Sequence, residues 1–312
     1  MPSRTKALLT LLVAPPILTE IASGNTPAHA FLNPRVVLFL ILAYSFPLLI
    51  IRECSLRLRL SAAGVFLLGL AYGIVNEGLL AQTLLRNEHV PIDTFDHYIY
   101  LAGFNFSWTC VIVPWHAFFA VLFPLALLAF WFPACAQTLW LSTRAFKMLA
   151  AIFVALMAFF SLVRTPHLQM LVCFLCIAAL SCTAFFFRDP SPPSRQPPVR
   201  RAVPFLFGLF AYPFFVLGSI ALAAKHAPAP VFFLFVVVVL LGVALIARRG
   251  EFLLQPVAAY LALGGYVSVS FFHFLAGIAH HSPEGIATGG VLVVSFLYLA
   301  LRRRHVPELR SS

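Results

Sequence analysis

Two residues of this sequence, Glu77 and His116, have side chains suited to acid–base chemistry and lie inside strongly apolar stretches. An ionised carboxylate costs roughly a few kcal/mol or more in the middle of a membrane and needs a partner. A glutamate paired with a histidine can act as a general base on water, because desolvation makes the carboxylate more basic while the imidazole orients it. We therefore interpret Glu77 and His116 as candidate catalytic residues, with the amides of Asn76 and Asn105 as candidate oxyanion donors.

The spacing of small residues predicts the direction in which Glu77 points. Gly69, Gly73 and Glu77 are four residues apart and share one face of a helix, and a Gly-x-x-x-Gly pair lets a second helix approach closely. At ~1.5 Å per residue, Glu77 lies on the order of 12 Å, and His116 about 15 Å, below the outer surface of the membrane. A single loop joins the two helices, so we expect Glu77 and His116 to be neighbours in a water-accessible pocket.

Five further polar residues of the apolar stretches, or at their ends, are secondary site candidates. They are Glu20, Gln82, Trp108, Ser270 and His273. Each is also compatible with an ordinary polar contact between helices. The histidines and glutamates lack a short metal-binding spacing such as His-Glu-x-x-His, so no cofactor is predicted and a metal ion is a minor alternative. The six cysteines indicate no disulfide framework, because most fall in apolar stretches or on the predicted cytoplasmic side.

Segments of the first 133 residues resemble a group of uncharacterised prokaryotic multi-pass membrane proteins. They include Gly69-Leu-Ala-Tyr-Gly-Ile-Val-Asn-Glu-Gly78 and the stretch from Asn105 to His116. A more distant resemblance is to the CAAX-protease and bacteriocin-processing (CPBP) intramembrane endopeptidases, which carry Glu-Glu-x-x-x-Arg on one span and Phe-x-x-x-His on the next. Asn76-Glu77 takes the place of the glutamate pair and His116 that of the histidine. Ala81 and Ile112 stand where that family has arginine and phenylalanine, so the resemblance that implies intramembrane proteolysis covers only the Glu-then-His layout.

The composition shows which elements must position these residues. Of the 312 residues, 62% are hydrophobic and only 10% are charged, and the mean hydropathy is +0.96. Soluble domains contain roughly 45–50% apolar and about 25% charged residues. A soluble globular protein is therefore excluded, and we predict an all-α, polytopic transmembrane helical bundle in a lipid bilayer.

Ten apolar runs are long enough, or nearly so, to cross an ~30 Å hydrocarbon core, so about ten spans are expected. The runs cover residues 7–22, 36–51, 60–85, 106–132, 148–163, 168–187, 204–224, 230–247, 254–279 and 287–301. The first run also imitates a secretory signal, with Ala28-His29-Ala30 as a small-residue cleavage site. Pro15-Pro16 and the long spacer after Leu18 favour an uncleaved helix instead.

The charge distribution predicts the orientation of the spans. With both termini inside, the alternation of the runs places seventeen of the 21 basic residues in the cytoplasm, as the positive-inside rule requires. Only Arg35, Arg86, Arg164 and Lys225 fall outside. The net charge of +11 therefore marks the cytoplasmic face and requires no nucleic-acid partner.

A proline- and arginine-rich stretch divides the chain. Residues 188–203 are predicted to form a cytoplasmic linker between a six-helix part, residues 1–187, which carries the candidate site, and a four-helix part, residues 204–312.

Three functions are compatible with this pattern in the cytoplasmic membrane of a prokaryotic cell. The first is an intramembrane hydrolase that acts on a lipid or a membrane-embedded peptide, with Glu77 activating water and His116 as its partner. The second is a proton- or cation-coupled transporter or lipid-handling protein that uses the same carboxylate as an ion site. The third is a structural membrane subunit. Sequence alone distinguishes neither these three nor the oligomeric state.

Overall fold

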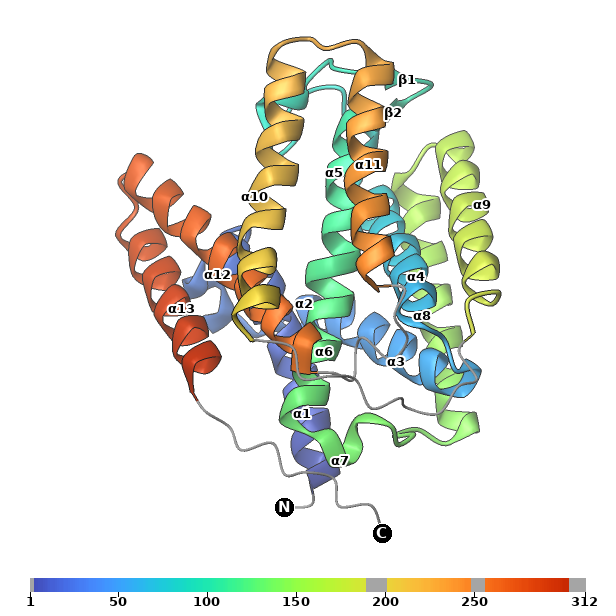
Figure 1. Cartoon of the computed structure of the whole chain (residues 1–312). Helices are drawn as coiled ribbons and strands as arrows, with labels where there is room; N and C mark the ends of the chain where they lie inside the picture. Colours follow the sequence, from blue (N-terminus) through green and yellow to red (C-terminus); the bar gives the residue numbers. More distant parts are fainter. Residues whose placement is uncertain (1–2, 189–200, 248–255, 303–312) are drawn as a thin grey trace.

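The computed structural model describes residues 3–188, 201–247 and 256–302, and nearly all of them are helical (Figure 1). The α-helices are α1 (Ser3–Pro16), α2 (Pro34–Leu40), α3 (Phe46–Leu58), α4 (Ala62–Ile74), α5 (Phe106–Trp115), α6 (Phe123–Trp131), α7 (Pro133–Ala136), α8 (Thr143–Arg164), α9 (His167–Ala184), α10 (Ala202–Ala224), α11 (Ala229–Ala247), α12 (Pro256–Ala279) and α13 (Pro283–Leu301).

Shorter elements interrupt or connect these helices. Four segments are π-helical, namely η1 (Ile17–Ile21), η3 (Ile41–Ser45), η4 (Val75–Leu80) and η7 (His116–Leu122). The connections contain the 3₁₀ turns η2 (Ala28–Leu32), η5 (Thr83–Leu85) and η6 (Asp93–Phe95), and a small antiparallel hairpin of β1 (Tyr100–Leu101) and β2 (Phe104–Asn105).

The predicted all-α membrane bundle is confirmed. Helix covers most of every one of the ten apolar runs, and eight helices in the described part of the chain are long and apolar enough to cross a membrane. The first run forms α1 and η1, and the run at 230–247 forms α11; neither is among those eight. Residues 189–200 of the predicted linker, and the first two residues of the run at 254–279, lie outside the described residues. The sidedness of the bundle and its division into two parts stay predictions.

The central element of the bundle is the continuous helix formed by α5, η7 and α6. Its most apolar window is 89% buried, whereas the corresponding windows of α8 and α9 are 11% buried. Hence α5–η7–α6 belongs to the protein core, and α8 and α9 leave most of their side chains exposed on the outside of the bundle. The helix begins where the side chain of Asn105 accepts a hydrogen bond from the backbone N–H of Trp108 at 2.9 Å, a normal N-terminal cap.

Helix α4 packs directly against this central helix through its glycine face. A Cβ atom added to Gly69 would lie 2.8 Å from Ala117 Cα, and one added to Gly73 would lie 2.8 Å from Val113 O. Real Cβ atoms do not approach that closely, so only glycine permits the backbones to meet. The close helix contact expected from the Gly-x-x-x-Gly spacing is therefore present, and its partner is the helix that carries His116.

The C-terminal half forms two hairpins. Helices α10 and α11 stand side by side at the centre of Figure 1. Helices α12 and α13 form the second hairpin, and α12 packs closely on α10, since a Cβ atom added to Gly208 would clash with Leu261 O. Tyr98 donates a hydrogen bond to Ala227 O at 2.8 Å, which joins the loop before β1 to the turn between α10 and α11.

A buried ion cluster attaches the connection after α6 to α3. Glu53 is fully buried; its Oε1 accepts from Arg52 Nη1 at 2.9 Å and from the Trp140 N–H at 2.8 Å, and its Oε2 accepts from Arg57 Nη2 and the Leu141 N–H, both at 3.3 Å. Arg52 Nη2 also donates to the backbone oxygens of Cys135, Ala136 and Thr138. Because α3 continues directly from η3, this cluster fixes the helix that carries Tyr44.

Candidate acid–base site

Glu77 and His116 form a buried hydrogen-bonded pair in the interior of the bundle. His116 Nε2 lies 2.7 Å from Glu77 Oε1, and the two residues are 1% and 8% exposed. Glu77 lies on η4, which extends α4, and His116 is the first residue of η7. An ionised carboxylate only accepts hydrogen bonds, so Nε2 carries the ring proton when Glu77 is charged. The structure thus brings together the two residues that the sequence predicts to lie at similar depths in the membrane.

The second oxygen of Glu77 is also engaged. The hydroxyl of Thr83 donates to Glu77 Oε2, and Trp108 Nε1 donates to the Thr83 hydroxyl at 2.9 Å. Trp108 is therefore connected to Glu77 through Thr83. Both oxygens of the carboxylate already accept a hydrogen bond, which holds its plane in one orientation.

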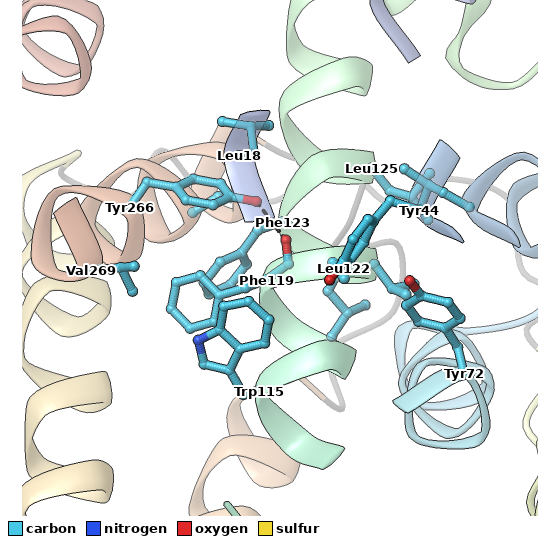
Figure 2. Packing of buried hydrophobic residues seen from close by; sticks show 14 of the residues in the cluster. Leu18, Tyr44, Tyr72, Trp115, Phe119, Leu122, Phe123, Leu125, Tyr266 and Val269 are labelled. Atoms are coloured by element: carbon cyan, nitrogen blue, oxygen red, sulfur yellow. Dashed lines mark hydrogen bonds between the residues drawn. The ribbon is translucent and has the colours of Figure 1, made fainter. Parts of the chain in front are cut away.

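Aromatic rings enclose the His116 imidazole. Tyr44 stacks on it with ring centres 6.2 Å apart and an interplanar angle of 20°, and Tyr72 meets it edge-on at 5.7 Å. Trp115 also meets it edge-on, at 4.9 Å. Figure 2 shows Tyr44 and Tyr72 on one side of the central helix and Trp115 on the other. Among the described residues, nothing hydrogen-bonds the second ring nitrogen of His116, Nδ1, although that atom is buried.

A second carboxylate, Glu20, is linked to the pair through Tyr44. The Tyr44 hydroxyl donates to Glu20 Oε1, and Thr26 Oγ1 donates to Glu20 Oε2 at 2.5 Å. The ring of Tyr44 therefore contacts the imidazole while its hydroxyl contacts the carboxylate. Glu20 is 8% exposed, as buried as Glu77.

Asn76 is joined to the site through Tyr72, one of the rings that contact the imidazole. Asn76 Nδ2 donates to the Tyr72 hydroxyl at 3.0 Å, and that hydroxyl donates to Ala43 O at 2.7 Å. An amide group has two N–H donors, so Asn76 keeps a second one beyond this hydrogen bond.

Each of the four π-helical segments in the described residues carries a member of this site. Segments η1, η3, η4 and η7 contain Glu20, Tyr44, Glu77 and His116, respectively. Turns of the π type are rare, and they recur at functional sites. Other side chains satisfy part of the disturbed backbone, since Tyr266 donates to Phe119 O of η7 at 2.7 Å (Figure 2).

The other candidate residues lie apart from the Glu77–His116 pair. Asn105 caps α5 and donates Nδ2 to Phe95 O at 2.9 Å, and Gln82 Nε2 donates to Thr165 Oγ1 at 2.9 Å. Ser270 and His273 lie on α12, and within the described ranges neither forms a hydrogen bond with Glu77 or His116. The His273 ring instead packs against Gly24.

Sequence reasoning missed Tyr44, Tyr72 and Thr83. All three are buried and touch Glu77, His116 or Glu20 directly. The available signal was the occurrence of tyrosines inside apolar runs, because a buried hydroxyl needs a polar partner there.

The site offers few ligands for a metal ion. The described residues contain no group of three or more His, Cys, Asp and Glu side chains placed to hold one. Glu77 and His116 supply two donor atoms that already bond to each other. The arrangement is instead suited to proton transfer, in which a carboxylate fixes an imidazole and leaves one ring nitrogen available.

Apolar helices of membrane-spanning length, packed around a buried Glu–His pair, define a multi-span membrane protein. More particularly, the chain belongs to an uncharacterized membrane protein family, whose profile matches residues 7–304. This confirms the expected membership of such a family. No curated protein and no solved structure matches the chain. The family match does not connect the chain to the CPBP endopeptidases.

Proposed function

We propose that this protein is a membrane-embedded hydrolase of the cytoplasmic membrane in which His116 is the general base and Glu77 positions it. The observation that carries the proposal is that His116 Nε2 is held by Glu77 at 2.7 Å while Nδ1 is buried without a hydrogen-bond partner in the described residues. Leaving a buried polar atom unpaired costs roughly 1–3 kcal/mol. The described residues hold five other such atoms, so the contact of Glu77 with the opposite ring nitrogen is what distinguishes His116.

The geometry favours the imidazole over the carboxylate as the base. Both Glu77 oxygens accept hydrogen bonds, whereas Nδ1 has a free lone pair when Nε2 carries the proton. His116 thus takes the role of general base that the sequence predicts for Glu77, and Glu77 becomes its partner. The same division of labour occurs in serine hydrolases, where a carboxylate fixes the tautomer of a histidine and stabilises its charged form.

In the proposed reaction, Nδ1 removes a proton from a water molecule as its oxygen attacks the carbonyl carbon of an ester or amide. The Glu77 carboxylate stabilises the resulting imidazolium, and the proton then passes to the leaving group. The second N–H of Asn76 is the candidate donor to the developing oxyanion. Asn105 takes no part in this scheme, because its side chain caps α5 and bonds to Phe95 O.

The test uses the full chain in liposomes with two probes, a fluorogenic phospholipid ester and a quenched fluorescent transmembrane peptide. We expect the wild type to cleave one of them, His116→Ala to abolish turnover, and Glu77→Gln to lower kcat by about 10²–10⁴-fold. The matched controls are His167→Ala and Glu88→Gln, which change exposed residues. Wild-type turnover in His116→Ala, or no cleavage of either probe by the wild type, would contradict the proposal.

A proton-coupled transporter is the second candidate, and the link from Glu20 through Tyr44 to His116 favours it. Two buried carboxylates with a tyrosine and a histidine between them are the kind of intramembrane polar groups that mark proton relays. In proteoliposomes with an internal pH dye, Tyr44→Phe should then stop proton flux while its ring still stacks on His116. Proton flux without a chemically altered product would select transport over hydrolysis.

A further inference from the structure

An apolar pocket lies between the central helix, α10 and α11. Its walls are mainly aromatic and include Trp115, Phe118, Phe119, Tyr212, Phe215 and Leu240. The central helix separates this pocket from Tyr44 and Tyr72, as the opposite positions of Trp115 and Tyr72 in Figure 2 show. Neither Glu77 nor His116 lines it, so the pocket is distinct from the acid–base site.

The pocket lies at the depth of the hydrocarbon core. Trp115 is nine residues from the start of the span Phe106–Trp131, and Tyr212 is ten residues from the start of Ala202–Ala224. At 1.5 Å per residue, both lie about 14–15 Å from the nearer end of their spans. The pocket also reaches the outside of the bundle, because its wall includes Phe207, which is 39% exposed. The medium next to its opening is therefore lipid chains.

The size of the pocket limits what can occupy it. It has room of about 70 Å³ for groups the size of a water molecule. Each such group takes roughly 10–15 Å³, so about five to seven of them fit. An α-helix with its side chains is about 10–12 Å across and cannot enter. A segment of a single hydrocarbon chain can enter, and it would restore the dispersion contacts that an empty aromatic cavity lacks.

We propose that this pocket binds one hydrocarbon chain of a membrane lipid, seated between α10, α11 and the Trp115–Phe119 turn of the central helix. The gain over bulk lipid is packing against rigid aromatic rings, because no apolar surface leaves water when a lipid chain moves from the bilayer into the pocket. The assignment concerns binding only and does not depend on the proposed hydrolase.

The test uses the full chain in nanodiscs that contain phosphatidylcholine with a diazirine at the middle of one acyl chain. After illumination, mass spectrometry maps the labelled residues. We expect adducts concentrated on the pocket residues rather than on exposed side chains of α8. Ala211→Phe places a ring in the pocket wall and should lower pocket labelling by about tenfold, which corresponds to ~1.4 kcal/mol of lost affinity.

The matched control is Ala221→Phe, the same change at an exposed position of α10, which should label like the wild type. Equal pocket labelling in Ala211→Phe and the wild type, or labelling spread evenly over lipid-facing residues, would overturn the proposal.

A second variant identifies the occupant without filling the cavity. Leu240→photoleucine puts a diazirine group of nearly the same size as the leucine side chain at the pocket wall, and a lipid adduct after illumination supports the proposal. An adduct with a second copy of the chain, or with another polypeptide, would overturn it.

Discussion

Replacing Glu53 with alanine should destabilise the protein more than any single change to an exposed residue. Glu53 is fully buried and accepts hydrogen bonds from Arg52, Arg57 and two backbone N–H groups, those of Trp140 and Leu141. Its removal leaves the Arg52 guanidinium, in a residue only 4% exposed, without its counter-charge.

The size of the expected loss in unfolding free energy depends on the charge of Arg52, which remains buried. Removing one partner of a buried ion pair costs about 3–5 kcal/mol, because the other charge remains out of water. Arg52 keeps three backbone carbonyl acceptors and a Trp140 ring 3.6 Å from its guanidinium carbon, which places Glu53→Ala near the lower end, at about 3 kcal/mol. Glu53→Gln keeps the volume but cannot accept all four donors, so we expect a loss of about 1–3 kcal/mol.

The assay is reversible unfolding in mixed micelles with increasing denaturing detergent, followed by tryptophan fluorescence and compared with the wild type. Glu88→Ala is the control, since the Glu88 side chain is 59% exposed and its contact with His97 is 3.4 Å long; it should change the free energy of unfolding by less than about 0.5 kcal/mol. A loss of under about 1 kcal/mol in Glu53→Ala would refute the reasoning, because the cluster would then not hold the connection after α6 onto α3.

Three further predictions concern a close helix contact, a helix cap and the membrane topology. Gly73→Ala should lower the free energy of unfolding by about 1–3 kcal/mol and lower turnover, because the new Cβ would lie 2.8 Å from Val113 O and would push Glu77 away from His116. The control is Gly242→Ala, whose Cβ would meet nothing within 4 Å and which should be neutral or stabilising in the same unfolding assay. Asn105→Ala should cost about 0.5–2 kcal/mol as a lost cap while kcat per folded molecule stays unchanged; a large fall in kcat would return Asn105 to the catalytic group. In a variant without native cysteines, Lys147→Cys should react with a membrane-impermeant thiol reagent only from the cytoplasmic side and Lys225→Cys only from the opposite side; the reverse pattern would invert the predicted topology.

Much of the architecture can be predicted from the sequence because it depends on local composition. A run of apolar residues must be helical in lipid, where no water is available to pair with an open backbone, and the ten runs therefore locate the helices. The spacing of Gly69 and Gly73 likewise marks a close helix contact, because removing two side chains from one face has few other uses in a span. Glu77 and His116 are polar residues in apolar stretches and have similar predicted depths, and these two features were sufficient to predict that they are neighbours.

The arrangement around that pair was decided only by the tertiary structure. Segment η3 brings Tyr44 against His116 from more than seventy residues away, and the segment around Glu20 meets the same tyrosine. No local pattern encodes such contacts, because they arise where distant helices pack. The π turns at Glu20, Tyr44, Glu77 and His116 are equally invisible in the sequence, since a strained turn persists only where surrounding side chains compensate for it. Composition and periodicity thus determined a helical membrane bundle with one buried Glu–His pair. Packing decided which nitrogen of His116 contacts Glu77 and which one, among the described residues, has no hydrogen-bond partner.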